Sequence, residues 1–182
     1  LLRMFVSPVE PHEPATVLRC TSKSASGTRL VSARSNDGGK SFGLADSVPG
    51  SDARGNRGWE SSAVTSKGDV RAVCLYHREV PARTAGAAMS GAHQHGATNQ
   101  RPAADGVARA RLSQIFFARL NEPASARAIA PGVCYCCKTA VATGANGTVV
   151  ATWRPVSAGN TRDIARAKSS DDGRTLAAPV RG

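Results

Sequence analysis

Short apolar runs separated by turn-forming residues make up most of the chain. Residues 63–74 and residues 140–153 each have the pattern of a strand, a turn and a second strand. The turns, Lys-Gly-Asp at 67–69 and Ala-Asn-Gly at 145–147, contain residues that tolerate positive φ between two short runs rich in β-branched residues. This combination is typical of a β-hairpin. The two segments therefore predict a repeated hairpin.

Further segments favour strands rather than helices. Residues 114–120 contain an Ile-Phe-Phe run, and residues 162–168 contain an isoleucine flanked by charged residues. No segment shows the sustained 3.6-residue apolar period of an amphipathic helix. No apolar run approaches the ~18 residues that a membrane-spanning helix needs. We therefore predict an all-β protein without a helical membrane span.

A turn motif occurs twice. Residues 35–42 and residues 169–176 both fit Ser-x-Asp-x-Gly-x-Ser/Thr followed by an apolar residue. In such a turn the aspartate, here Asp37 or Asp171, accepts backbone N–H groups across the turn, and the glycine takes a positive φ. Two matches in 182 residues are more than chance would give.

This motif resembles the Asp-box, or bacterial neuraminidase repeat, of sialidase-like β-propellers. In that family the box caps the hairpin between the third and fourth strands of a blade, at the blade edge and away from the substrate pocket. The resemblance implies an all-β fold whose blades are four antiparallel strands with Asp-box turns. The spacing agrees with it: once residues 78–112 are set aside as an insertion, the hairpin recurs after about 44 residues. Propeller blades repeat every ~40–50 residues.

The repeat of about 44 residues also divides the chain into blades. We expect residues 1–182 to form a single sialidase-like propeller domain, with blade parts at 1–48, 59–130 and 137–182 and with the insertion 78–112 inside the second. That makes about three blades, whereas closed propellers usually have four to eight. We therefore expect a fragment of a larger, six-bladed propeller. Insertions after inner strands tend to rise over the face where ligands bind, so the insertion is expected beside a ligand site.

Charge narrows the choice of partners. The chain carries 24 Lys and Arg against 13 Asp and Glu, a net charge of +11. This charge permits attraction to nucleic acids, anionic lipids or acidic glycans. Nucleic-acid-binding proteins normally cluster their charge or interleave it with aromatic residues. Here the arginines are scattered and aromatic residues make up 4% of the chain, so we expect an acidic glycan rather than a nucleic acid.

The cellular compartment has to be inferred from cysteine usage. The chain begins Leu1-Leu2-Arg3, with no Met and no leader peptide, so we expect any targeting segment to be removed or not included. Five cysteines in a chain of this size are consistent with disulfides, which persist in oxidising compartments. We expect the protein to be periplasmic or secreted.

Three of the five cysteines, Cys134, Cys136 and Cys137, lie within four residues. Sulfur donors are soft ligands that favour Cu(I) or Zn. The insertion contributes His93 and His95, which could complete a mixed site if the insertion folds over the cysteines. The sequence therefore predicts a copper or zinc site made of these five residues.

Two other interpretations of the cysteines stay open. They could form ordinary disulfides, and because five is odd, at least one would remain outside such a pair. A bridge between the neighbours Cys136 and Cys137 would be strained. We therefore expect any bridge to run from the cluster to Cys20, Cys74 or Cys134. Residues 134–138, Cys-x-x-Cys-Lys, also match a rare variant of the haem attachment motif, whose usual form is Cys-x-x-Cys-His.

The sialidase resemblance also implies catalytic groups: an arginine triad, an aspartate acid/base and a tyrosine nucleophile activated by a glutamate. The candidates are Tyr76, Tyr135, Glu60 and Asp163, but none lies in a recognisable catalytic motif. The Arg-Ile-Pro segment that commonly supplies the first triad arginine is absent. A nucleophilic cysteine has no assigned His or Asp partner. The catalytic residues are therefore unknown, and we expect Tyr76 to lie on an inner strand facing the central channel.

Together these features favour an exported Asp-box propeller with a Cys/His-rich face that binds a metal or is stiffened by disulfides around a ligand. The alternative is an exo-sialidase-type glycoside hydrolase acting on acidic glycans. A third class is a noncatalytic propeller that binds other proteins. Trp59 and Trp153 are expected to pack between blades.

Overall fold

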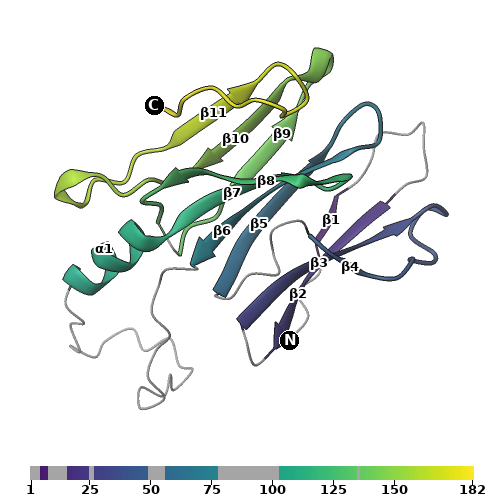
Figure 1. Ribbon diagram of the computed structural model, residues 1–182, viewed down its shortest axis with the longest axis horizontal. Helices are drawn as coiled ribbons and strands as arrows, with labels where there is room; N and C mark the ends of the chain where they lie inside the picture. The colour runs from purple at the N-terminus through teal and green to yellow at the C-terminus, as the bar shows by residue number, and fades with distance from the viewer. Residues whose placement is uncertain (1–4, 8–15, 25–26, 49–55, 78–102, 135) are drawn as a thin grey trace.

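The computed structural model describes residues 5–7, 16–24, 27–48, 56–77, 103–134 and 136–182 (Figure 1). These residues form three four-stranded antiparallel sheets that follow one another along the chain. The first sheet contains β1 (Phe5–Ser7), β2 (Thr16–Ser24), β3 (Gly27–Ser35) and β4 (Asp46–Ser47). The second contains β5 (Asn56–Val64), β6 (Val70–His77), β7 (Gln114–Arg119) and β8 (Glu122–Pro131). The third contains β9 (Ala140–Thr143), β10 (Val149–Trp153), β11 (Ala165–Ser169) and β12 (Val180–Arg181).

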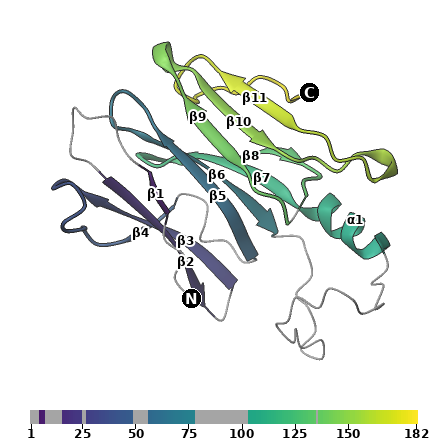
Figure 2. The same ribbon diagram turned by 180° about the vertical axis from the view of Figure 1, so that it is seen from behind.

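In each sheet the strands are hydrogen-bonded in sequence order, so that every sheet is a simple meander. The three sheets lie side by side, as the views from the front and from behind both show (Figures 1 and 2). The all-β prediction is confirmed, and both predicted hairpins are present as β5–β6 and β9–β10. The second hairpin turns through Asn146 and Gly147, which have φ values of 57° and 72°.

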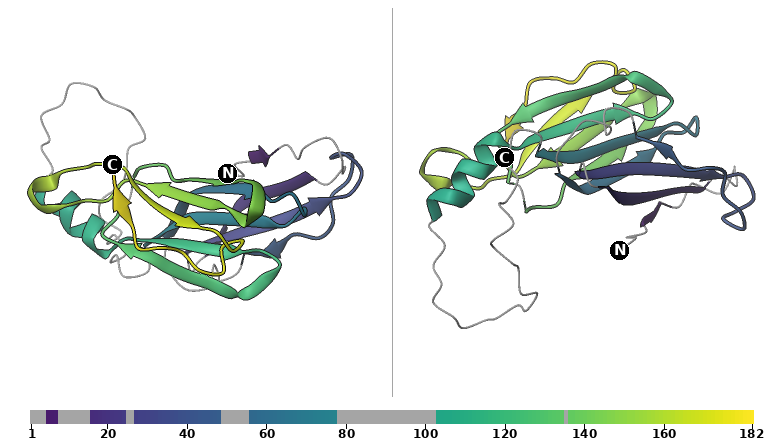
Figure 3. Two further views of the ribbon diagram at one scale, coloured as in Figure 1. Left: turned by 90° about the horizontal axis from the view of Figure 1, so that it is seen from above. Right: turned by 60° about the horizontal axis from the view of Figure 1, so that its bottom comes forward.

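One helix departs from the all-β expectation. Helix α1 (Ala103–Leu112) lies between β6 and β7, inside the expected insertion (Figure 3). Four of its ten residues are alanine, the strongest helix former, and Arg109 and Arg111 lie in its last turn, where cations favour the helix dipole. The helix has only weak amphipathic character, so a search for apolar periodicity misses it. No described helix is long and apolar enough to cross a membrane.

The main core lies between the second and third sheets. Val73, Ile115 and Phe117 of the second sheet pack against Val149 and Trp153 of the third, and all five side chains are buried. The prediction that Trp153 packs between blades is therefore confirmed. The inner strands of the two sheets are also joined by hydrogen bonds: Thr143 Oγ1 donates to the Val64 carbonyl at 2.6 Å, and the Val141 N–H donates to Ser61 Oγ at 3.2 Å.

A second apolar cluster lies between the first and second sheets. It consists of Leu30, Val48, Cys74 and Tyr76, with Phe116 packed against it. The Tyr76 ring stacks on Phe116 with 4.1 Å between the ring centroids. Tyr76 is only 2% exposed, so it belongs to this core, and the prediction that it faces a central channel is wrong. The reason is that β6 is buried on both faces.

The two Ser-x-Asp motifs fold into the predicted turns. In the first aspartate turn (residues 35–41), Ser35 Oγ donates to Asp37 Oδ1 and accepts the Gly39 N–H at 2.8 Å. The Asp37 carboxylate accepts both the backbone N–H of Ser41, at 2.9 Å, and its hydroxyl. The turn thus satisfies its own polar groups without help from the rest of the protein.

The second aspartate turn (residues 169–175) repeats this bonding. Ser169 Oγ donates to Asp171 Oδ1 and accepts the Gly173 N–H at 2.9 Å, while Asp171 accepts the N–H and hydroxyl of Thr175. This turn also joins two sheets. Its carbonyl at Asp172 accepts a hydrogen bond of 2.8 Å from Nε of the buried Arg71 on β6.

The hydrogen bonds that hold the two aspartates make the stability of these turns dependent on pH. The Ser35 hydroxyl, with the hydroxyl and N–H of Ser41, lowers the pKa of Asp37 from 3.8 to about 2, and the Ser169 hydroxyl and the Thr175 groups hold the pKa of Asp171 below its usual range. A lowered folded-state pKa stabilises the fold above about pH 4, and this contribution is lost as the pH falls from about 4 through the folded-state pKa, which is about 2 for Asp37 and lower for Asp171.

We therefore expect an Asp37→Asn/Asp171→Asn variant to be less stable than the unmodified protein at neutral pH, with a clearly smaller difference at pH 2. Urea unfolding at several pH values measures the difference. Because other carboxyl groups titrate equally in both proteins, only the difference between the two curves is informative. A constant difference from pH 7 to pH 2 would contradict the assigned role of the two carboxylates.

Candidate functional site

The cysteine segment (residues 132–134 and 136–139) connects β8 to β9 and is held by both sheets. On one side the Gly132 N–H donates to the Ser113 carbonyl, just before β7, at 2.9 Å. On the other side the Cys134 N–H donates to the Arg154 carbonyl, just after β10, at 2.8 Å, and the Val156 N–H donates to the Gly132 carbonyl at 2.8 Å. The segment therefore has a fixed backbone at the junction of two sheets.

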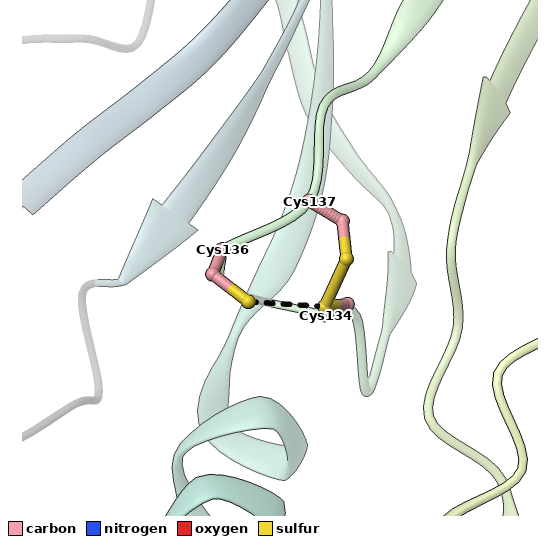
Figure 4. Close-up of side chains that lie close together, drawn as sticks. All are labelled: Cys134, Cys136 and Cys137. Carbon is pink, nitrogen blue, oxygen red and sulfur yellow. Dashed lines mark hydrogen bonds between the residues drawn. A yellow bond between two sulfur atoms is a disulfide. The ribbon is translucent and has the colours of Figure 1, made fainter. Parts of the chain in front are cut away.

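The segment lies at the end of the sheets opposite to the second aspartate turn. That turn is bound to the β9–β10 turn through the Asp172 N–H and the Gly147 carbonyl, whereas the cysteine segment contacts the far end of β10. Helix α1 lies at the same end of the sheets as the cysteine segment, and the close-up shows the helix next to the cysteines (Figure 4). The two ends of the sheets thus carry different structures.

Two of the clustered cysteines form a disulfide, Cys134–Cys137, whose Cα atoms are 5.4 Å apart. The third sulfur, Cys136 Sγ, lies 3.5 Å from Cys134 Sγ (Figure 4). All three sulfur atoms lie within 4.8 Å of one another. Cys134 is buried, Cys137 is half-buried and Cys136 is exposed. The structure therefore brings together the three sulfur atoms that the sequence singled out.

The disulfide agrees with the expectation that a bridge would run from the cluster to Cys20, Cys74 or Cys134. Cys74 is buried in the core between the first and second sheets. His93 and His95 lie outside the described residues, so their predicted part in a metal site stays a prediction.

One cationic side chain contacts the sulfur atoms, and two more line the space beside them. Arg162 Nη1 donates to Cys134 Sγ at 3.1 Å, and Arg154 Nε donates to the Arg162 carbonyl at 3.2 Å. Lys138 is exposed next to the disulfide. An open hollow begins at the disulfide and is lined by Cys137, Lys138, Thr139, Ala140, Thr152, Trp153, Arg154 and Ile164. The hollow is therefore positively charged at its rim, with an apolar wall at Ile164.

The residues that flank the insertion, His77 and Ser113, are hydrogen-bonded to each other and, through Ser113, to the cysteine segment. His77 ends β6, and its Nδ1 lies 2.9 Å from Ser113 Oγ, which donates to the Arg109 carbonyl of α1 at 2.9 Å. Burial, together with the positive charge of Arg109, lowers the pKa of His77. The Ser113 carbonyl also accepts the Gly132 N–H, so the base of the insertion is bonded directly to the cysteine segment.

The candidate catalytic residues do not assemble at this hollow. Tyr76 is buried against Phe116, and Glu60 lines a small apolar cavity between the first and second sheets. Asp163 is exposed beside Arg162, and Tyr135 lies outside the described residues. Catalytic roles therefore stay unassigned.

Comparisons with known proteins identify the fold. No protein-family model and no curated protein matches the sequence. Among solved structures, the chain is similar to the Hadza microbial sialidase Hz136, with a TM-score of 0.59 and 15% identity over 98% of this chain and 37% of that one. It is also similar to Trypanosoma rangeli sialidase, with a TM-score of 0.53 and 13% identity over 100% of this chain and 30% of that one.

A third similar structure is the Penicillium chrysogenum α-L-arabinanase complexed with arabinobiose, with a TM-score of 0.52 and 12% identity over 98% of this chain and 49% of that one. The chain thus spans about a third to a half of the length of these proteins. At such low identity the likeness establishes the fold alone. The three sheets are blades of the β-propeller type.

Proposed function

We propose that this chain belongs to an exported sialidase-like propeller, larger than these 182 residues, that binds a negatively charged saccharide at the hollow beside the cysteine segment. In this proposal the aspartate turns are Asp-boxes, and the blade parts are residues 1–48, 59–130 and 137–182. The observation that carries the proposal is the open hollow whose rim holds Lys138 and Arg154 next to a disulfide.

The chemistry of the rim suits a carboxylate. A guanidinium group donates two parallel hydrogen bonds to a carboxylate, and charge-assisted bonds of this kind are stronger than neutral ones. Arg154 is oriented by the bond from its Nε to the Arg162 carbonyl, and in this proposal its Nη groups bind the carboxylate. Lys138 adds a second positive charge.

The wall of the hollow suits a sugar ring. Ile164 is 56% exposed and lines the hollow, so the apolar face of a pyranose could cover it. Burying apolar surface contributes about 25 cal/mol per Å². The disulfide and the backbone bonds of the cysteine segment hold the rim in place, which reduces the entropy lost on binding.

Calorimetric titration with sialyllactose and with lactose tests this proposal. We expect sialyllactose to bind more tightly, and Arg154→Ala to weaken it about tenfold to hundredfold, because one charge-assisted hydrogen-bond pair is lost. Arg174→Ala is the matched control: Arg174 is an exposed arginine in the second aspartate turn, at the opposite end of the sheets. Equal affinity for both sugars, or an unchanged Arg154→Ala variant, would refute the proposal.

An enzymatic assay separates binding from hydrolysis. Because Tyr76 is buried against Phe116, we expect the protein to release no sialic acid from a fluorogenic sialoside. Turnover that disappears in a Tyr76→Phe variant would instead support the glycoside hydrolase alternative. A neutral-sugar substrate serves as the control for contaminating hydrolases.

A further inference from the structure

We propose that Cys134, Cys136 and Cys137 form a Cu(I) site that is closed while the disulfide is intact and opens when it is reduced. This inference does not rest on saccharide binding. It starts from the third sulfur: Cys136 Sγ lies 3.5 Å from Cys134 Sγ, beside the bridge from Cys134 to Cys137. A bridge that served only to stiffen the loop would need no third sulfur at this distance.

The separations fit one metal ion. Metal–sulfur bonds in thiolate sites such as those of zinc are about 2.3 Å long, which places the three sulfur atoms of a trigonal site about 4 Å apart. The three sulfur atoms already lie within 4.8 Å of one another. Once the disulfide is broken, its two sulfur atoms need only rotate apart, because the backbone is fixed at Gly132 and Cys134.

The surrounding charges favour thiolates. Three thiolates and one Cu(I) carry a net charge of −2, and the Arg162 guanidinium already donates to Cys134 Sγ at 3.1 Å. A neighbouring cation stabilises a thiolate relative to the thiol. Lys138 and Arg154 line the adjoining hollow and offset the remaining charge.

The number and type of ligands select the metal. Structural zinc sites take four protein ligands, and the described part of the chain offers three at this place. Thiolates are soft donors that prefer Cu(I), which accepts three-coordinate sites. Exposure of Cys136 leaves a path for the ion to enter.

A dithiol reductant supplies two electrons and two protons, the Cys134–Cys137 bond breaks to two thiols, and the reductant becomes a cyclic disulfide. Cu(I) then displaces the protons of the three thiols into solvent, and its oxidation state does not change.

The test is anaerobic titration of the whole chain with Cu(I) in the presence of a chromogenic Cu(I) chelator. After reduction and removal of the reductant, we expect one copper per chain, and in the oxidised protein none. Cys136→Ser should lower the affinity of the reduced protein by about hundredfold or more, since even outer contacts of metal ligands are worth 10–100-fold. This variant keeps both disulfide cysteines, and Cys136 is exposed, so the fold should be retained.

Cys74→Ala is the matched control, because Cys74 is buried in a different part of the fold, and it should bind copper unchanged. Four results would overturn the inference: equal uptake by oxidised and reduced protein, unchanged affinity in Cys136→Ser, displacement of Cu(I) by an equal concentration of Zn(II), or loss of copper in a His93→Ala/His95→Ala variant. The last result would show a mixed Cys/His site in place of a three-sulfur site.

Discussion

Gly173→Ala is expected to lower the free energy of unfolding by about 2–5 kcal/mol. A Cβ atom at this position would lie 2.5 Å from Phe117 Cζ and 2.9 Å from Cε1, and Gly173 has a φ of +81°. Overpacking costs about 1–3 kcal/mol, and a left-handed backbone costs a residue other than glycine about 1–2 kcal/mol. Urea unfolding measures the change as a shift of the midpoint at constant slope.

Two companion variants separate the clash from the backbone effect. Gly38 in the first aspartate turn has a φ of +71°, but a Cβ atom added there would meet no atom within 4 Å, so Gly38→Ala should cost only about 1–2 kcal/mol. Combining Gly173→Ala with Phe117→Leu should cost less than the sum of the two single changes, because the smaller side chain relieves the clash. Equal losses in Gly173→Ala and Gly38→Ala would mean that the turn does not press against Phe117.

Trp153→Ala should be the other strongly destabilising change, by about 3–5 kcal/mol. Trp153 is 2% exposed and packs in the core between the second and third sheets. Its removal leaves a cavity that the two sheets can only partly close. Thermal and urea unfolding both measure the loss.

The neighbouring Ile164→Ala supplies the control, because Ile164 is 56% exposed and its removal should change stability by about 0.5 kcal/mol or less. The loss of stability in Trp153→Phe should lie between the losses in Trp153→Ala and Ile164→Ala. If Trp153→Ala unfolded at the same urea concentration as Ile164→Ala, the core assigned to the second and third sheets would be wrong.

Most of the fold was predictable because its signals are local. The hairpin turns contain residues that accept positive φ, and Asn146 and Gly147 adopt it. The Ser-x-Asp motifs carry all the groups of their own hydrogen-bond network, so spacing within eight residues was enough to predict Asp37 and Asp171 at turns. Helix α1 was missed because its alanines favour a helix through propensity without producing an apolar stripe.

The site was predictable only in part. Cys134, Cys136 and Cys137 are neighbours in sequence, so their clustering followed directly, but which pair forms the bridge depends on the three-dimensional path of the turn. Arg162 donates to a sulfur 28 residues earlier in the chain. No spacing rule predicts the contact between Arg162 and Cys134. It forms because the connection between β10 and β11, which contains Arg162, passes beside the cysteine segment that leads into β9.

The second aspartate turn and the cysteine segment lie at opposite ends of the strands, and this separation determines which residues can be substituted without unfolding the protein. At one end of the strands, Arg71 is bonded to the second aspartate turn and Phe117 packs against it, while Lys138 and Arg154 line the hollow at the other end. Substitutions of the Lys138 and Arg154 side chains therefore leave the Arg71–Asp172 hydrogen bond and the packing of Phe117 intact. Ligand specificity can therefore be redesigned at these two exposed side chains at little cost to folding, whereas Trp153, which also lines the hollow, belongs to the core.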